Sequence, residues 1–344
     1  MSKIKVLIVD DSIFMRKVLS DMLCSDSKII VVGTASNGLE ALKEIEKLKP
    51  DVVTMDIEMP KMDGLTALEH IMRDNPLPVI MVSTLTQEGS DATARALLLG
   101  AVDVVPKPVN LPHMNLRKIK DDLISKVKAV ACSSLKKTKR IKSKIKTGVI
   151  KTSALSKRKV VLIGASTGGP SALLEVLSGL PKDFPVPIAI VQHMPDGPFI
   201  KSLAERLDGM SQIRVKEAHV NDLLESGLAL LAPGGFHMLI EKKGVVKFSR
   251  GPLINGVRPS VDVMMNSAVS VYKENTIGVI LTGMGKDGAE AMALIKKKGG
   301  CTIVEDESSC VVYGMPKAVV DMGNADVVTS LSDIPGKMVE MLER

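Results

Sequence analysis

The chain has no Trp, and aromatic residues make up only 2% of its 344 residues, so aliphatic side chains must fill its cores. No uncharged apolar run approaches the roughly 18 residues that a membrane-spanning helix needs. The four cysteines show no Cys-x-x-Cys spacing, which argues against a zinc site and for reduced thiols in a cytoplasm. The start, Met1 to Asp10, is a short apolar run that ends in acids and is unlike a signal peptide. We therefore expect a cytoplasmic protein without membrane insertion.

The formal charge of +7 is concentrated in one segment. Eleven Lys and Arg and no acidic residue lie between Cys132 and Lys159, so the rest of the chain is net acidic. This segment is rich in Ser and Thr and has little apolar periodicity, which indicates a flexible linker and not a nucleic-acid groove. A weak contact with an anionic surface is the alternative. We predict an N-terminal domain at 1–131, a basic linker at 132–157 and a C-terminal domain at 158–344.

Strand and helix patterns alternate on both sides of this linker. The N-terminal part has strand patterns at 4–9, 29–34, 52–55, 79–82 and 102–105, and helical patterns at 13–23, 38–48, 65–73, 92–99 and 116–130. This order predicts an α/β domain with a doubly wound, five-stranded parallel sheet of the flavodoxin-like type. The C-terminal part has strand patterns at 159–163, 188–191, 228–232 and 277–281, a hairpin at 236–249, and helical patterns from 171 and at 199–207, 260–271 and 289–297. It predicts a larger, less regular, Rossmann-like α/β domain.

Polar residues follow four of the N-terminal strands. Asp10 and Asp11 follow the first strand, Asp56 the third, Ser83 the fourth and Lys107 the fifth. The carboxyl ends of parallel strands meet at one edge of a sheet, so these groups are expected to lie together. Three carboxylates repel one another unless a cation bridges them, and Mg²⁺ prefers oxygen ligands. A metal, a hydroxyl and a lysine suit phosphoryl transfer, whereas the alternative is that each acid only caps a helix or turn.

The N-terminal part resembles a response-regulator receiver domain. The resemblance rests on VDDS at 9–12, MDIEMPKMDG at 55–64, VIMVST at 79–84 and PKP at 106–108. It implies that Asp56 is the phosphoacceptor and that Asp10, Asp11 and Asp56 hold Mg²⁺ together with a backbone carbonyl near Glu58. It also implies that Ser83 is the switch hydroxyl and that Lys107 senses the phosphate.

A Gly-rich turn at 164–170 follows the first C-terminal strand and precedes a helix, which exposes Ser166 as a candidate nucleophile. Phosphate binding is the rival interpretation, although neither G-x-G-x-x-G nor a P-loop is present. Of His193, His219 and His237, only His193 directly follows a strand, so it is the preferred base. Asp287 follows another strand and could orient the imidazole. The alternative role, which can coexist with this one, is to cap the helix near 289.

The order Ser, His, Asp differs from the order of the α/β-hydrolases. The C-terminal part instead resembles the catalytic domain of chemotaxis protein-glutamate methylesterases, through GASTGGP at 164–170, QHMP at 192–195, LAPGGFHM at 231–238, RPSVDVM at 258–264, LTGMGKDG at 281–288 and CVVYGMP at 310–316. The resemblance implies that Ser166, His193 and Asp287 are catalytic, that the Met284 amide stabilises the oxyanion and that Thr167 supports the site. It also implies deamidation of specific receptor glutamines.

The two resemblances imply a phosphorylation-activated hydrolase. Its expected partners are the cytoplasmic domains of methyl-accepting chemoreceptors as substrates and a chemotaxis histidine kinase as phosphodonor, with no nucleic acid. The hydrolase part is expected to need no metal, because polar groups of the protein suffice for the reaction. The alternatives are a DNA-binding response regulator, suggested by the pI near 9.1, and a phosphate-binding protein without esterase activity.

Overall fold

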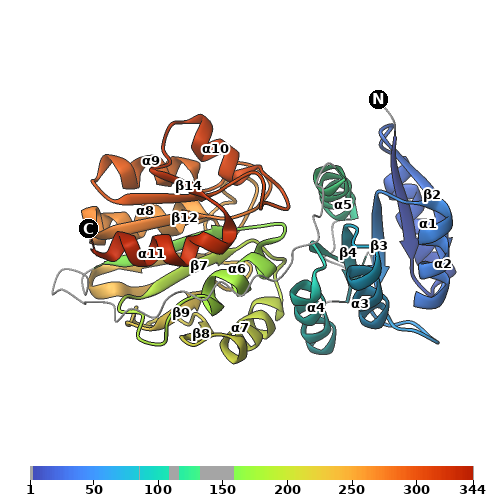
Figure 1. Ribbon diagram of the computed structural model, residues 1–344, viewed down its shortest axis with the longest axis horizontal. Helices are drawn as coiled ribbons and strands as arrows, with labels where there is room; N and C mark the ends of the chain where they lie inside the picture. The colour runs from blue at the N-terminus through green and yellow to red at the C-terminus, as the bar shows by residue number, and fades with distance from the viewer. Residues whose placement is uncertain (1–2, 85, 108–115, 132–158, 344) are drawn as a thin grey trace. The chain divides into compact units, whose positions relative to one another are not determined.

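The structure is a computed structural model that describes residues 3–84, 86–107, 116–131 and 159–343. The chain divides into two compact units, Met1–Lys139 and Arg140–Arg344 (Figure 1). The expected linker at 132–157 lies outside the described residues. None of the helices in the described part is long and apolar enough to cross a membrane. Cys24 and Cys310 are free thiols.

The first unit contains the expected five-stranded parallel sheet, in the order β2-β1-β3-β4-β5 (Figure 1). Its central strands are buried because they consist almost entirely of aliphatic residues and have helices on both faces. The strand order changes direction at β1, so the carboxyl ends of β1 and β3 form the edge at which such sheets bind ligands. The strands are β1 Ile4–Val9, β2 Ile29–Ala35, β3 Val52–Asp56, β4 Val79–Ser83 and β5 Asp103–Pro106.

The helices of this unit begin where a polar side chain caps them. The hydroxyl of Ser12 accepts a hydrogen bond from the Met15 amide, and Asn37, Asp63 and Thr86 cap the next three helices in the same way. Helix α1 packs against α5, whereas α2, α3 and α4 pack in a row. The helices are α1 Ile13–Cys24, α2 Gly38–Leu48, α3 Gly64–Asp74, α4 Gln87–Leu99 and α5 Leu116–Val130.

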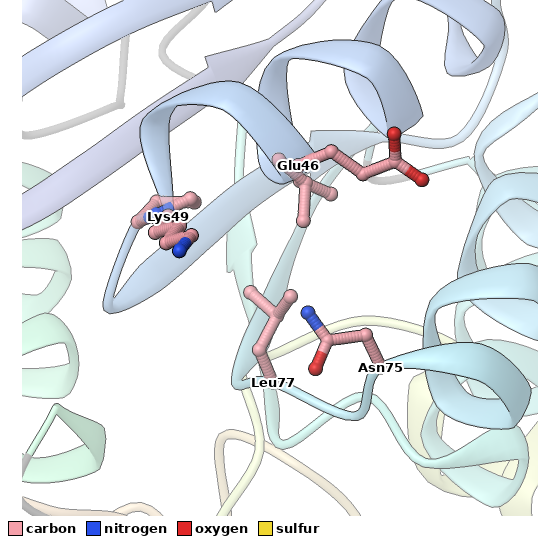
Figure 2. Close-up of a pocket in the computed structure, with 6 residues that line it drawn as sticks. Glu46, Lys49, Asn75 and Leu77 are labelled. Atoms are coloured by element: carbon pink, nitrogen blue, oxygen red, sulfur yellow. The ribbon is translucent and has the colours of Figure 1, made fainter.

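A cavity of about 530 Å³ lies at the amino ends of β3 and β4. Figure 2 shows Glu46 and Lys49, from the last turn of α2 and just beyond it, above Asn75 and Leu77, which precede β4. Ile45 and Pro50 complete the lining. Because Pro50 and Leu77 lie before their strands, this cavity is at the opposite end of the sheet from Asp10 and Asp56.

The second unit is built on a seven-stranded parallel sheet in the order β14-β13-β12-β6-β7-β9-β8 (Figure 1). The neighbours β12, β6 and β7 are fully buried, so their carboxyl ends meet at the middle of one edge. A separate antiparallel hairpin is formed by β10 His237–Glu241 and β11 Val245–Ser249, joined by η2 Lys242–Gly244. The sheet strands are β6 Val160–Ala165, β7 Ile188–Gln192, β8 Arg214–Glu217, β9 Leu228–Leu231, β12 Thr276–Ile280, β13 Cys301–Glu305 and β14 Val327–Thr329.

Helices cover this sheet in two groups. Helix α9 packs against α8 and α10, and α6 packs against α7 and α11. The methionines and small aliphatic residues of α8, α9 and α10 share one buried core with the sheet. The helices are α6 Gly169–Ser178, α7 Phe199–Met210, α8 Val261–Tyr272, η3 Lys273–Asn275, α9 Ala289–Lys297, α10 Met315–Asp321, η4 Leu331–Asp333 and α11 Ile334–Glu343.

The structure corrects several boundaries. Helix α4 begins at Gln87 and not at 92, because Thr86 supplies the cap. The last strand of the first unit is Asp103–Pro106, one residue later than expected. Gly288, not Asp287, is the N-cap of α9, so the carboxylate of Asp287 does not cap that helix. The strands β8, β13 and β14 and the helices α10 and α11 were not expected from the sequence pattern.

Candidate active site

The structure brings the three acids of the first unit together. Asp10, Asp11 and Asp56 each offer a carboxylate oxygen, and these oxygens lie within 4.8 Å of one another. This follows from the pairing of β1 with β3, which places the ends of both strands side by side. Asp10 and Asp56 are buried, whereas Asp11 is exposed. The cluster therefore has two fixed carboxylates and one that faces solvent.

Lys107 lies against the buried acids, as expected from its position after β5. Its Nζ donates a hydrogen bond to Asp56 Oδ2 at 2.6 Å and lies 3.5 Å from Asp10 Oδ2. The amide of Ile57 donates to Asp56 Oδ1 at 2.7 Å, so both oxygens of Asp56 have a donor. Ser83 lies at the end of β4, and its hydroxyl donates to the Gly89 carbonyl at 3.2 Å. The backbone carbonyl of Ser83 accepts a hydrogen bond from the Lys107 amide.

Burial dominates the electrostatics of this cluster. It raises the pKa of Asp56 to about 6, although Lys107 opposes the change, and it also raises the pKa of Asp10. Burial alone would lower the pKa of Lys107, but its contacts with Asp56 and Asp10 raise it. Two buried carboxylates with a single lysine leave a negative excess, which a further cation would neutralise.

The carboxylate oxygens of this cluster are suitable ligands for Mg²⁺. All three side chains offer carboxylate oxygens, which are hard ligands. Asp10 Oδ2 is buried and accepts no hydrogen bond within the described residues, so it has a lone pair available for a metal ion. The three carboxylates are the only group of this kind that the described part of the chain contains.

In the second unit, Ser166 occupies the turn between β6 and α6. Gly168 adopts a positive φ of 81° there, and the Gly169 amide donates to the Ser166 carbonyl at 2.8 Å. These contacts close a sharp turn, which only glycine makes without strain. Ser166 is partly exposed, while Thr167 beside it is buried. The hydroxyl of Ser166 is thus presented at the carboxyl edge of the sheet.

His193 stands next to this turn. Ala165 pairs with Gln192 across β6 and β7, and the His193 amide donates to the Ala165 carbonyl at 3.0 Å. Ser166 and His193 are therefore the first residues beyond two paired strand ends. The amide and carbonyl of Ser166 are held by Thr282, Gly169 and Gln192, which fixes the backbone that carries its hydroxyl.

Asp287 completes the arrangement from the loop after β12. Its Oδ2 lies 2.9 Å from His193 Nε2 and accepts the Val261 amide at 2.6 Å. Its Oδ1 accepts from the hydroxyl of Ser260 at 2.7 Å and from the side-chain amide of Asn255 at 3.0 Å. Because a carboxylate is only an acceptor, all of these partners act as donors, and Nε2 of His193 carries the proton.

These donors fix the charge of Asp287. Burial would raise its pKa, but the hydrogen bonds from His193, Ser260 and Asn255 lower it to about 2. The neighbouring Asp262 shows the opposite behaviour, because burial raises its pKa to about 6. Asn255 donates to both carboxylates and so bridges an ionised acid to a second one with a near-neutral pKa.

The expected oxyanion donor also lies near Ser166. A Cβ added to Gly283 would lie 2.7 Å from the Cβ of Ser166, so the backbone before Met284 packs directly on the serine. The Gly283 carbonyl accepts from the Met315 amide at 2.8 Å. Since the C=O and N–H of a trans peptide point in opposite directions, the Met284 N–H points away from Met315. The amide of Ser166 itself donates to Thr282 at 3.0 Å.

Sequence reasoning missed several buried residues that hold the serine turn. The side-chain amide of Gln192 donates to the carbonyls of both Ser166 and His193, at 2.9 and 3.0 Å. Thr282 donates through its hydroxyl to the Thr167 carbonyl at 3.0 Å, and its amide donates to Glu305 at 2.7 Å. Gln192 adjoins the predicted base and could have been found from its position at a strand end, but no sequence signal marks Glu305.

The other two histidines do not reach the serine turn. Nε2 of His237 lies 2.9 Å from the Pro252 carbonyl, and its Nδ1 accepts from the Ser260 amide at 3.2 Å. Both nitrogens are therefore used in structural hydrogen bonds. His219 is exposed and lies 3.9 Å from Asp222. His193 is the histidine that contacts the carboxylate of Asp287.

Comparisons with known proteins cover both units. The family model for the CheB methylesterase matches residues 161–338, and that for the response regulator receiver domain matches residues 6–119. A protein-glutamate methylesterase/protein-glutamine glutaminase from Symbiobacterium thermophilum is 48% identical over 96% of this chain and 95% of its own length. One of the same name from Pyrococcus horikoshii is 46% identical over 99% of this chain and 94% of its own length.

A solved structure agrees with the second unit. The CheB methylesterase catalytic domain of Thermotoga maritima superposes with a TM-score of 0.51 and 48% identity, covering 53% of this chain and 98% of its own. The resemblance found in the sequence motifs is thereby confirmed at the level of family and fold. The chain belongs to the CheB methylesterase family and carries a response regulator receiver domain before its methylesterase domain.

Proposed function

We propose that this chain is a phosphorylation-activated serine hydrolase that removes methyl esters from chemoreceptor glutamates and deamidates specific receptor glutamines. The observation that carries the proposal is the 2.9 Å contact between His193 and Asp287 at the strand end beside Ser166. Relatives that match both units are named protein-glutamate methylesterase/protein-glutamine glutaminase. They support this function, and not that of a DNA-binding or phosphate-binding regulator. A cytoplasmic location and the linker boundaries stay predictions.

His193 acts as the base through its Nδ1. Nε2 carries a proton because it faces the carboxylate of Asp287, so Nδ1 has the free lone pair. Nδ1 takes the proton of the Ser166 hydroxyl as its oxygen attacks the ester carbonyl. The resulting imidazolium is stabilised by Asp287, which stays ionised because of its low pKa.

The negative charge on the tetrahedral oxygen rests on backbone amides. The Met284 N–H is the first candidate, since the Ser166 amide already donates to Thr282. The start of α6 adds the positive end of its dipole. Thr167 supports this arrangement through its carbonyl, which is bound by Thr282.

The intermediate collapses when the imidazolium at His193 gives its proton to the leaving oxygen and methanol departs. An acyl-serine remains on Ser166. His193 then takes a proton from water, whose oxygen attacks the acyl carbon, and the glutamate carboxylate is released as Ser166 regains its proton. Glutamine follows the same course with ammonia as the leaving group.

The receiver unit controls this reaction through Asp56. Its carboxylate accepts the phosphoryl group from a chemotaxis histidine kinase, while Lys107 and Ser83 bind the new phosphate oxygens. Asp10, Asp11 and Asp56 are the residues that would hold Mg²⁺, which supplies positive charge to the phosphoryl oxygens when bound. The chemoreceptor is the substrate in this scheme, and the kinase is the phosphodonor.

The nucleophile is tested with Ser166→Ala. We expect it to abolish methanol release from a methylated chemoreceptor fragment. Ser178→Ala is the matched control, because Ser178 lies at the far end of the helix that follows Ser166. The assignment is wrong if the Ser166 variant keeps near-normal turnover, or if a serine-directed acylating probe labels it as well as the native chain.

Regulation is tested with a small phosphodonor. We expect it to accelerate methanol release by the native chain and to leave the Asp56→Asn variant at its basal rate. Asp51→Asn is the control, because Asp51 is exposed at the amino end of β3, where its carboxylate accepts from the Lys5 amide at 2.8 Å. Equal acceleration of the Asp56 variant would exclude Asp56 as the phosphoacceptor.

A further inference from the structure

A tight turn beside Asp287 presents side chains that the proposed reaction does not use. It connects β11 to α8, and Ile254 and Val257 exchange hydrogen bonds of 3.2 and 2.9 Å across its end. Asn255 and Gly256 have positive φ values of 52° and 80°, which is the geometry of a type I′ turn. We call residues 253–256 the tip loop.

The tip loop is firmly anchored to the active site. The side-chain amide of Asn255 donates to Asp287 and to Asp262, each at 3.0 Å. Just before the loop, the Pro252 carbonyl binds the buried His237 at 2.9 Å, and the Gly251 carbonyl accepts from the Arg258 guanidinium at 2.8 Å. The loop therefore holds its shape without a ligand, which lowers the entropy cost of binding one.

Its apolar side chains nevertheless face solvent. Leu253 is 47% exposed and Ile254 is 36% exposed, side by side on the loop that contacts Asp287. Arg250 belongs to the same connection; it is exposed, and its guanidinium lies 4.5 Å from the ring centre of Phe236. An apolar pair next to an exposed arginine suits a polypeptide that carries both apolar and acidic side chains.

The length of a glutamate side chain requires such a contact. Three C–C bonds separate its Cα from the ester carbonyl, so the substrate backbone must come within about 4 Å of the carbon that Ser166 attacks. Residues two positions away in an extended peptide, or three to four positions away in a helical one, lie about 5–7 Å from that glutamate. In the proposed mechanism, the imidazole of His193 and its hydrogen bonds to Ser166 and Asp287 span a comparable distance. Asp287 and the tip loop lie at the far end of that span.

We propose that the tip loop is a docking surface for the protein substrate. Leu253 and Ile254 contact an apolar side chain near the methylated glutamate, while the exposed Arg250 faces acidic neighbours of the kind that the reaction itself generates. The occupant is the chemoreceptor segment that carries the ester. This inference rests on the proposed function and assigns the substrate contact of the same site.

The test compares two substrates on the full chain carrying Leu253→Ser and Ile254→Ser. One is a soluble methylated chemoreceptor fragment, and the other is the γ-methyl ester of N-acetyl-glutamate amide, which is too short to reach the loop. We expect KM for the fragment to rise about tenfold, because two half-exposed apolar side chains lose their contact. The rate on the small ester should stay within about twofold of the native value. Met210→Ser is the control, since Met210 is 52% exposed at the end of α7, on the opposite edge of the sheet.

The outcomes separate the possibilities. An unchanged KM for the fragment overturns the proposal, and so does an equal loss on both substrates, which would make the loop part of the catalytic machinery. A higher basal rate in the variant without phosphodonor, with KM unchanged, would identify the receiver unit as the occupant instead. If the native chain hydrolyses neither ester, the proposed function fails, whatever the loop does.

Discussion

Asp287→Asn is the most informative change in the second unit. It replaces a carboxylate, which only accepts hydrogen bonds, with an amide whose NH₂ group donates them. Apart from the neighbouring carboxyl of Asp262, the groups around the carboxylate are donors, namely His193, Asn255, Ser260 and the amides of Val261 and Asp262. An asparagine must turn an NH₂ group toward some of them. If it faces Nε2 of His193, that nitrogen becomes the acceptor, the proton moves to Nδ1, and no lone pair is left to face Ser166.

The size of the effect follows from this tautomer change. The corresponding change in serine proteases lowers kcat about 10⁴-fold, and we expect a loss of about 10³–10⁴, or about 4–5.5 kcal/mol. The fold is also weakened. The pKa of Asp287 is about 2 when folded, against about 3.9 when unfolded, so its charge stabilises the native state by on the order of 2–3 kcal/mol. This contribution is complete above about pH 4 and is lost as the pH falls through the folded value.

The assay is methanol release from a methylated chemoreceptor fragment between pH 5 and 9, with urea unfolding of the same samples. Asp262→Asn is the matched control, because Asp262 also accepts from Asn255 and its amide donates to Asp287, whereas the carboxylate that His193 contacts is that of Asp287. It should keep kcat within about tenfold of the native value. The reasoning fails if Asp287→Asn keeps more than a tenth of native kcat, or if both variants lose activity equally.

Two further predictions concern residues that surround the serine turn. In Gly283→Ala, the new Cβ would lie 2.7 Å from the Cβ of Ser166, so kcat should fall at least about 100-fold. The control is Gly336→Ala, on an open face of α11, which should leave kcat unchanged. Equal kcat values for the two variants would contradict this reasoning. Burial raises the pKa of Glu305 from 4.5 to about 7, so the native state loses stability as the pH rises between these values. Glu305→Gln should remove this dependence of the unfolding free energy on pH. The variant should be more stable than the native chain at pH 8, by on the order of 3 kcal/mol, but not at pH 4. If the urea midpoints of the two proteins differ by the same amount at both pH values, the ionised carboxylate costs no stability.

Much of the fold could be predicted because the patterns were long and well bounded. Helices α2 and α5 and strand β11 begin and end where the sequence indicated. The missed strands carried weak patterns. Arg214–Glu217 buries only Val215, and Val327–Thr329 has three residues, as befits strands at the edges of a sheet. Cys301–Glu305 is buried but ends in a glutamate, which sequence reasoning places at the surface.

The candidate catalytic residues could be predicted to lie together because each directly follows a strand or lies in the loop after one. Their supports were not, since Asn255, Ser260 and Thr282 act through contacts between segments far apart in the chain. The expected capping role of Asp287 was wrong for the same reason. Its carboxylate is turned toward α8 and the tip loop, and no local pattern at 287–289 reveals those partners.

The hydrogen bonds that Asp287 accepts from three separate segments have a consequence for heat inactivation. Asp287 is held by the first turn of α8, by the loop that follows the hairpin and by the residue after β7. Loosening of any one of these segments removes a hydrogen bond from the carboxylate that faces His193, so turnover needs all three. Since all three belong to the second unit, we expect turnover to be lost at the calorimetric transition of that unit, whether or not the first unit unfolds at another temperature.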